Sequence, residues 1–206
     1  ATTEIYTLSL HDALPIFDFF DGMMARALDA HSIIGKDLDS LADDVSFGVA
    51  PSLIVFSLFK EMDYSGAMES LAGVFPYLAF LLSVFSALRL AKFNNDTRQT
   101  SSFVGLPVPA NALFWASLVT GAHDWLVSSN FHPVYLLLLV CLFSWLLVSE
   151  IPMFSLKFKN LSWKDNKTSF IFLLVCIPFL IFLGICSFSA IIVWYILLSL
   201  ITRKSK

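Results

Sequence analysis

Charge is scarce in this sequence. Only 14% of its 206 residues are charged and the formal net charge is −3, whereas 57% are hydrophobic. With so few basic residues, we expect no nucleic-acid partner. The 21 phenylalanines and the mean hydropathy of +0.77 are instead typical of a polytopic membrane protein, most of whose surface faces lipid.

Cysteines and histidines are also few, and repeats are absent. The cysteines lie in apolar segments without the spacing of a disulfide framework or a metal site, so we expect buried free thiols: Cys141, Cys176 and Cys186. Three histidines are scattered without metal-ligand spacing and receive no role: His31, His123 and His132. Without an internal repeat or a low-complexity tract, the chain is expected to form one membrane domain.

Six apolar runs approach the roughly 20 residues that a helix needs to cross a bilayer. They are 38–59, 71–91, 106–127, 134–151, 169–186 and 190–202. Segment 17–30 is also helical in pattern, but at about 1.5 Å per residue it reaches only about 21 Å of a hydrocarbon core of about 30 Å. We therefore predict an all-α, polytopic transmembrane helical bundle of about seven helical segments, with a tight hairpin at residues 186–189.

The basic residues fall on alternate loops, which indicates an orientation. If the loop after residue 30 is cytoplasmic, twelve of the 13 lysines and arginines lie on or beside the cytoplasmic side, and only Lys60 lies outside. The outer loop, 60–70, carries three acids. By the positive-inside rule, this orientation places the aspartates near the start of the chain at the cytoplasmic face.

Those aspartates form two pairs. Asp18 and Asp21 are three residues apart and share a helix face. Asp39 and Asp43, four residues apart, share a face of the next helix. A carboxylate at bilayer depth costs roughly 2.5–3.5 kcal/mol, and neighbouring carboxylates repel one another unless cations neutralise them. Two antiparallel helices could turn both pairs toward one site, where the carboxylates would hold two divalent ions against a pyrophosphate.

Small and basic residues accompany the aspartates. Gly22 and Gly35 would let a bulky ligand approach the backbone closely, and Arg26 can neutralise phosphate charge. A solvated helix end would explain one such aspartate, but it does not explain the whole arrangement. A cation transporter is a remote alternative. It predicts acids spread over several helices at the middle of the membrane, whereas these acids cluster on two adjacent helices at one face.

The same residues resemble a family signature. They match every fixed position of D-x-x-D-G-x-x-A-R, eight residues, and G-x-x-x-D-x-x-x-D, the signature of the CDP-alcohol phosphatidyltransferases: Asp18, Asp21, Gly22, Ala25, Arg26, Gly35, Asp39 and Asp43. Segments 35–51, 89–94, 96–100 and 103–111 are most similar to the phosphatidylserine synthases of bacteria and archaea within that family. The motifs cover residues 17–111, and the remainder agrees in helix count only.

The resemblance implies a role for each signature residue. It implies metal ligands for two Mg²⁺ or Mn²⁺ ions, with the last also a candidate catalytic base: Asp18, Asp21, Asp39 and Asp43. It implies a nucleotide site at Asp21, Gly22, Ala25, Arg26, Gly35 and Asp39. The implied activity is metal-dependent transfer of the phosphatidyl group from CDP-diacylglycerol to L-serine, which gives phosphatidylserine and CMP. A homodimer in the prokaryotic cytoplasmic membrane is implied as well.

Serine is a zwitterion, so its pocket should offer a cation for the carboxylate. Candidate cations at the cytoplasmic edge are Lys36, Arg89, Lys92 and Arg98, with Asn94 as a candidate neutral partner, although the positive-inside excess alone also explains basic residues there. A sister enzyme would accept glycerol phosphate, inositol phosphate or choline. A phosphorylated acceptor would need additional arginines, so the few basic residues favour serine. Asp44 lies about 100° around the helix from Asp43 and is expected to be structural.

The first sixteen residues do not fit the resemblance. Members of the family begin with a short amphipathic segment and a full first transmembrane helix, whereas residues 1–16 have mixed polarity and Pro15. The segment also reads like one frame of a common sequencing adapter. We therefore expect residues 1–16 to be non-native and residues 17–206 to form the membrane domain, with one more helix in the natural protein. We assign no role to His11 or Asp12.

Overall fold

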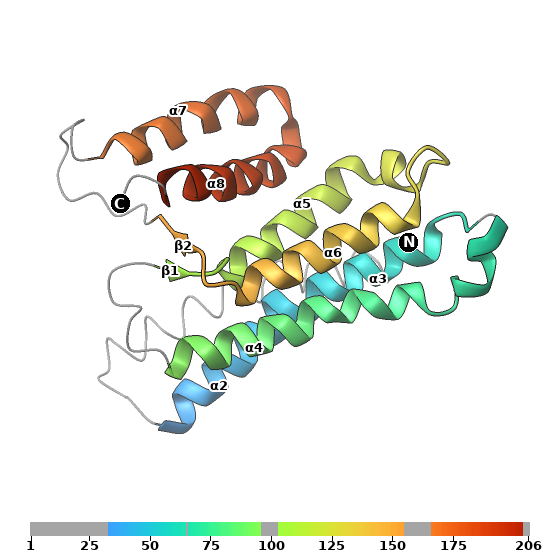
Figure 1. Cartoon of the computed structure of the whole chain (residues 1–206), viewed down its shortest axis with the longest axis horizontal. Helices are drawn as coiled ribbons and strands as arrows, with labels where there is room; N and C mark the ends of the chain where they lie inside the picture. Colours follow the sequence, from blue (N-terminus) through green and yellow to red (C-terminus); the bar gives the residue numbers. More distant parts are fainter. Residues whose placement is uncertain (1–32, 65, 96–102, 155–165, 204–206) are drawn as a thin grey trace, which may run out of the picture.

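The computed structural model describes residues 33–64, 66–95, 103–154 and 166–203 (Figure 1). The expectations for residues 1–16, the 17–30 helix and the first half of the signature lie outside this part of the chain. The elements follow in the order α2 (Ile33–Asp44), η1 (Val45–Val49), α3 (Ala50–Glu61), η2 (Gly66–Leu71), η3 (Phe75–Phe80), α4 (Leu81–Asn95), β1 (Phe103–Val104), α5 (Val108–Val127), α6 (Pro133–Val148), β2 (Pro152–Met153), α7 (Lys167–Phe182), η4 (Gly184–Cys186) and α8 (Ser187–Arg203). Apart from two strands of two residues each, all of these elements are helical, which confirms the all-α class.

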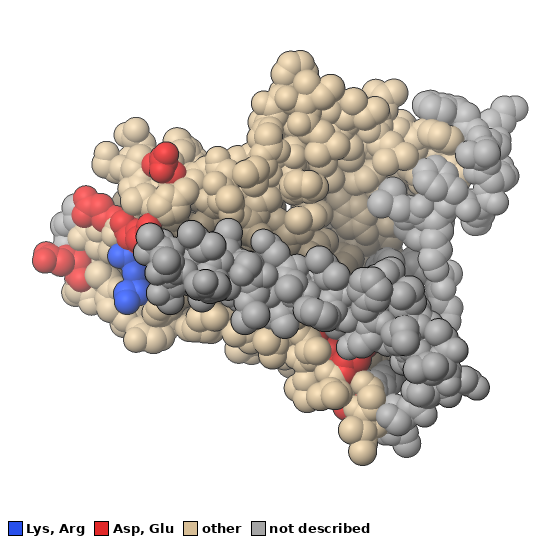
Figure 2. Space-filling view, turned by 180° about the vertical axis from the view of Figure 1, so that it is seen from behind, with Lys and Arg blue, Asp and Glu red and all other residues tan. Residues whose placement is uncertain are grey.

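The helices confirm a membrane protein. Three helical stretches are long and apolar enough to cross a bilayer: Asp37–Glu61, Phe75–Asn95 and Gly184–Thr202. Two more apolar helices, α6 and α7, are shorter, and α5 has 20 residues that include His123 and Asp124. Each of these six helical stretches overlaps one of the predicted apolar runs. In Figure 2 the charged side chains of the described residues lie toward the two ends of the molecule, and the described surface visible between them is uncharged, as a protein surrounded by lipid requires.

Four long helices form the main bundle. α3 packs against α5, and α4 packs against α6, with α5 and α6 side by side (Figure 1). Aromatic side chains fill the centre, where Trp115 is fully buried and the rings of Phe114 and Phe143 stack with their centroids 3.9 Å apart. Large buried rings hold these helices in fixed positions, because a close-packed interior resists changes in side-chain volume.

The hairpin of α7 and α8 joins this bundle through small residues. Ser117 on α5 and Ser189 on α8 form a hydrogen bond of 2.5 Å, and the Ser189 hydroxyl also donates to the Phe114 carbonyl at 2.9 Å. Gly121 lies so close to Cys186 that an added Cβ would sit 2.9 Å from the Cys186 backbone nitrogen. Small residues of this kind let membrane helices approach closely. A hairpin joins α7 and α8 as predicted, but its turn lies before residues 186–189: Gly184, with φ of 54°, forms the turn, and α8 already begins at Ser187.

The first long helix is continuous through a π turn, η1. Pro51 has no N–H to donate to the preceding turn, and the wider turn brings the Ala50 N–H to the Val45 carbonyl instead. The Ser52 hydroxyl donates to the Gly48 carbonyl at 2.7 Å, so its side chain supplies a donor within the altered ladder. The helix therefore passes from the aspartates of α2 into the centre of the bundle.

One prediction about the cysteines is wrong. All three thiols are free, Cys176 is buried and Cys186 is half-buried, but Cys141 is exposed on α6. An apolar segment indicates burial only where the surroundings are water. A helix in a membrane is apolar on its outer face as well, so Cys141 can lie on the lipid side of an equally apolar helix.

Candidate functional site

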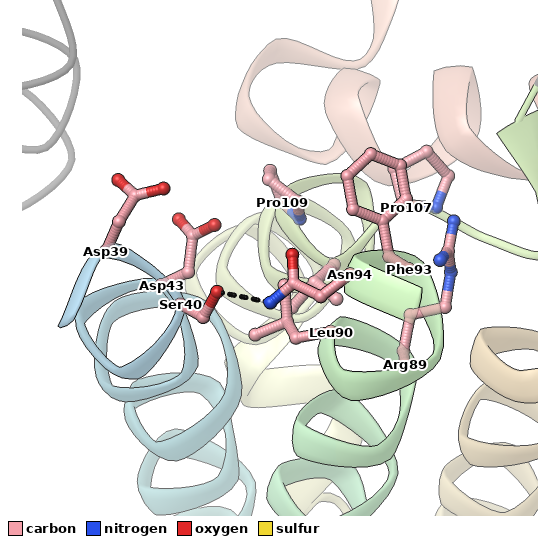
Figure 3. Close-up of a pocket in the computed structure, with 10 residues that line it drawn as sticks. Asp39, Ser40, Asp43, Arg89, Leu90, Phe93, Asn94, Pro107 and Pro109 are labelled. Atoms are coloured by element: carbon pink, nitrogen blue, oxygen red, sulfur yellow. Dashed lines mark hydrogen bonds between the residues drawn. The ribbon is translucent and has the colours of Figure 1, made fainter. Parts of the chain in front are cut away.

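Two of the signature aspartates face one cavity. Asp39 and Asp43 lie on the same face of α2, as their spacing predicts, and both line a cavity of about 180 Å³ (Figure 3). The cavity is bounded by α2, by the end of α4 and by the start of α5. Its lining residues are Asp39, Ser40, Asp43, Arg89, Leu90, Phe93, Asn94, Pro107, Val108 and Pro109. Asp39 is exposed and Asp43 is half-buried, so the carboxylates are open to a ligand.

Arg89 provides a cation on the opposite wall. In Figure 3 it lies on α4 across the cavity from Asp39, and its side chain runs beside Phe93. The guanidinium carbon is 5.4 Å from the centre of the Phe93 ring, a cation–π arrangement. Only 4% of Arg89 is exposed. A cavity that holds both Arg89 and two carboxylates suits a ligand with charges of both signs.

A hydrogen bond ties α4 to the aspartate helix. The Asn94 side-chain amide donates to the Ser40 hydroxyl at 2.7 Å, and Figure 3 shows this bond along the near edge of the cavity. Ser40 follows Asp39 directly, so the bond fixes the turn of α2 that carries the aspartates. Asn94 therefore has a positioning role in addition to lining the cavity.

The third wall depends on a close backbone contact near Gly105. Gly105 has φ of 80°, and an added Cβ would lie 2.7 Å from the Leu147 carbonyl oxygen. Its N–H donates to the Ile151 carbonyl at 2.8 Å, and the Leu106 N–H donates to the Leu146 carbonyl at 3.0 Å. These bonds satisfy backbone carbonyls at and beyond the C-terminal end of α6. Beside them, β1 pairs antiparallel with β2.

The same segment sets the start of α5. Pro107 directly precedes the helix and Pro109 lies in its first turn, where a missing N–H is not needed. Both prolines line the cavity, so the Gly105 contact determines where this wall stands relative to the aspartates. The short ribbon of β1 and β2 was not predicted from the sequence, because two-residue strands carry no detectable alternation.

Asp44 does not line the cavity, in agreement with its predicted position on α2. One of its carboxylate oxygens is buried next to Gly48, and an added Cβ on Gly48 would also lie 2.9 Å from Ser86 Cβ on α4. Among the described residues this oxygen and the Ser86 hydroxyl have no hydrogen-bond partner. Gly48 thus allows α4 to approach the aspartate helix closely.

The remaining candidates are distributed as follows. Lys92 lies outside the cavity lining, where its ammonium is 3.5 Å from the Glu150 carboxylate and 3.3 Å from the Val148 carbonyl at the end of α6. Gly35 and Lys36 lie in α2, and the Lys36 side chain is outside the described part of the structure. Several candidates also lie outside it: Asp18, Asp21, Gly22, Ala25, Arg26 and Arg98.

Several lining residues, Leu90 among them, were not given a role from sequence. Ser40, Phe93 and Val108 have ordinary side chains for a membrane helix, so their type carries no signal. Phe93 could have been found from its spacing, because it lies four residues after Arg89 and therefore on the same helix face. Ser40 could not, because its partner Asn94 is 54 residues distant in the sequence.

The donor set suits a hard divalent cation. Asp39 and Asp43 offer carboxylate oxygens, the ligands that Mg²⁺ and Mn²⁺ prefer. No group of three His, Cys, Asp or Glu side chains that could hold a metal occurs within the described ranges. Two carboxylates from one helix leave room in a coordination shell for further oxygens, which a bound pyrophosphate or other residues could supply.

Comparison with known proteins gives matches over most of the chain. The family model of the CDP-alcohol phosphatidyltransferases matches residues 5–148. A protein of Helicobacter pylori named CDP-diacylglycerol–serine O-phosphatidyltransferase is 31% identical over 204 residues, which cover 93% of this chain and 81% of the relative.

Two other organisms have relatives with the same name. The Bacillus subtilis protein is 37% identical over 134 residues, which cover 65% of this chain and 66% of the relative. The Methanocaldococcus jannaschii protein is 36% identical over 114 residues, which cover 55% of this chain and 50% of the relative. Asp39, Asp43, Arg89 and Asn94 all fall within the residues that the family model matches.

Proposed function

Because the chain belongs to the CDP-alcohol phosphatidyltransferase family, we propose that it transfers the phosphatidyl group of CDP-diacylglycerol to L-serine. The products are phosphatidylserine and CMP. The observation that carries the proposal is the placement of Asp39, Asp43 and Arg89 around one cavity. The name shared by the relatives supports serine as the acceptor.

The transfer needs a general base that accepts the proton of the serine hydroxyl, and a site that binds the departing CMP. The serine hydroxyl oxygen attacks the phosphorus that carries diacylglycerol, and the bond from that phosphorus to the bridging oxygen of the pyrophosphate breaks. CMP leaves with that oxygen, and the hydroxyl proton passes to the Asp43 carboxylate. Asp43 suits this role because it is half-buried and lines the cavity, so its oxygens face a bound acceptor.

We assign the divalent metal to the aspartates. Asp39 and Asp43 would contribute ligands from α2, and Asp18 and Asp21 complete the set that the family signature implies. A bound Mg²⁺ or Mn²⁺ supplies charge neutralisation for the pyrophosphate of the nucleotide. Gly35, one turn before Asp39 on α2, leaves space for the cytidine part.

Arg89 is assigned to the carboxylate of serine. Its planar guanidinium can hold a carboxylate with two parallel hydrogen bonds, and stacking on Phe93 orients it. Arg89 is the one lysine or arginine among the described lining residues. A phosphorylated acceptor carries more negative charge and would require more cations, which makes serine the better fit than glycerol phosphate or inositol phosphate.

We further propose that the cavity opens at the cytoplasmic face, which the positive-inside rule favours and where nucleotides are found. The acyl chains of CDP-diacylglycerol would remain in the bilayer beside the apolar surface while the head group enters the cavity. A homodimer is retained as a proposal from the family resemblance.

An acceptor assay tests the proposal directly. Membranes that contain the protein are given CDP-diacylglycerol, Mg²⁺ or Mn²⁺, and radiolabelled serine. We expect CMP release that depends on serine and on the divalent ion, with label in the lipid fraction. CMP release with glycerol phosphate, inositol phosphate or choline, and none with serine, would assign the protein to a sister activity.

Substitution of Arg89 tests its proposed role. We expect Arg89→Lys to raise the KM for serine about 10- to 100-fold, because a lysine keeps the charge but loses the paired hydrogen bonds. The KM for CDP-diacylglycerol should change little. Steady-state kinetics with each substrate varied in turn measure both values, and Lys167→Gln, which removes an exposed charge at α7, is the matched control.

An equal increase in both KM values would contradict the assignment. It would show that Arg89 supports the cavity as a whole instead of the acceptor alone. A melting curve of the variant separates this outcome from simple unfolding.

A further inference from the structure

A second cavity lies at the other end of the main bundle. It has a volume of about 270 Å³ and lies between the last turns of α3 and the segment 72–77. Its lining includes Phe56, Lys60, Tyr64, Gly73, Pro76 and Tyr77. None of them lines the cavity of Asp39 and Asp43, so the two cavities are separate.

The position of Lys60 places this cavity at the opposite membrane interface. Lys60 and Asp43 belong to one continuous helical stretch, Asp37–Glu61, and are 17 residues apart. At about 1.5 Å per residue the separation along the axis is about 26 Å, close to the thickness of the hydrocarbon core. Tyr77 is exposed at the same end, as tyrosines at the boundary between lipid and head groups often are.

The cavity combines one cation with aromatic walls. The Lys60 ammonium lies 5.6 Å from the centre of the Phe56 ring, and the Phe56 and Tyr77 rings meet edge to face at 5.4 Å. The neighbouring carboxylate of Glu61 contacts His123 on α5 at 2.9 Å. Lys60 is also the only lysine or arginine between residues 37 and 88. Acids also lie on this loop, but Lys60 is the charged side chain that lines the cavity, so the lining suits a ligand with a negative charge at Lys60 and an apolar part against the rings.

Tyr64 forms a fixed wall of the cavity. Its hydroxyl donates to the Phe59 carbonyl at 2.9 Å, and its ring packs edge to face against Phe75. Burial raises the pKa of Tyr64 to about 12, so this hydroxyl remains protonated at physiological pH. The wall is therefore neutral, and Lys60 carries the positive charge that faces the ligand.

We propose that this cavity binds a membrane phospholipid, with the lipid phosphate at Lys60 and the glycerol and upper acyl carbons against Phe56 and Tyr77. The lipid belongs to the leaflet opposite the Asp39 cavity, so it is a bound structural or regulatory lipid and not the substrate. Free phosphate is the poorer occupant, because one exposed lysine provides too little attraction without the apolar contacts.

Native mass spectrometry of the detergent-purified protein tests the proposal. Phosphatidylglycerol is titrated into the parent protein, Lys60→Gln and Gly73→Trp. Gly73 lines the cavity and nothing lies within 4 Å of a Cβ added to it, so a tryptophan there meets no clash at Cβ and is chosen to block the cavity. We expect Lys60→Gln to weaken retention of one phospholipid about fivefold, and Gly73→Trp to remove that lipid.

Lys167→Gln is the matched control, since it removes an exposed lysine at the end of the molecule where α7 begins, and its phospholipid retention should equal that of the parent (Figure 1). Unchanged retention in Lys60→Gln and Gly73→Trp would overturn the proposal. Displacement of the lipid by inorganic phosphate would overturn it too, because the site would then be a simple anion site. If Gly73→Trp melts at a lower temperature than the parent, the Lys60→Gln result decides.

Discussion

Asp43→Asn is expected to lower serine-dependent CMP release about 1,000-fold. The amide keeps the shape of the side chain but cannot accept the hydroxyl proton, and a positioned general base contributes on the order of 10²–10⁴ to a rate. Asp43 lines the cavity with Asp39 and is half-buried, so the substitution should leave the packing of α2 unchanged. The measurement is kcat with saturating CDP-diacylglycerol, together with the Kd of the nucleotide.

Asp37→Asn is the control for this experiment. Asp37 is exposed on the same helix and does not line the cavity. Asp37→Asn therefore removes one carboxylate of α2 without changing the proposed catalytic groups. Its CMP release should equal that of the parent protein. If Asp43→Asn weakens nucleotide binding as much as it lowers kcat, Asp43 acts primarily as a metal ligand and a different group takes the proton.

Gly105→Ala is expected to destabilise the fold by about 3 kcal/mol and to lower activity with it. The positive φ of 80° is strained for alanine, and its Cβ would lie 2.7 Å and 2.8 Å from the carbonyl oxygens of Leu147 and Ser149. These are backbone atoms at the end of α6, which cannot move aside as a side chain could. Differential scanning fluorimetry in detergent at a fixed scan rate should show a lower melting temperature.

Gly73→Ala provides the comparison. Nothing lies within 4 Å of a Cβ at Gly73, so this substitution should leave the melting temperature nearly unchanged. Equal melting temperatures for Gly105→Ala and Gly73→Ala would contradict the account of the contact with α6. Loss of activity in Gly105→Ala without loss of stability would indicate that the segment acts on the cavity wall alone, through Pro107.

The positions of the helices were largely predictable from the sequence. The predicted run 106–127 corresponds to α5, and the run 134–151 corresponds to α6 with its end three residues earlier. Apolar runs define helices well in a membrane, because every backbone group must be satisfied within the segment. The second run begins later than predicted, at Phe75, where a 3-10 turn with Pro76 precedes α4.

The cavity was only partly predictable. The spacing of Asp39 and Asp43 placed them on one helix face, since a separation of four residues is a local property of a helix. It could not separate Arg89 from Lys92, which lie three residues apart near the end of the same helix. The packing of α4 against α6 determines which of the two lines the cavity. Lys92 lies beside Glu150 at the end of α6, whereas Arg89 lines the cavity.

The sequence by itself therefore determined the membrane class, the helical segments and the pairing of carboxylates along α2, because these follow from composition and from contacts within one helix. Only the tertiary structure decided which residues from α4 and α5 join Asp39 and Asp43. The bond from Asn94 to Ser40, the backbone contact of Gly105 with α6 and the separate cavity at Lys60 join residues that are brought together only when the helices pack. Such contacts depend on the shapes of two surfaces at once, and the order of residues along one chain does not specify them.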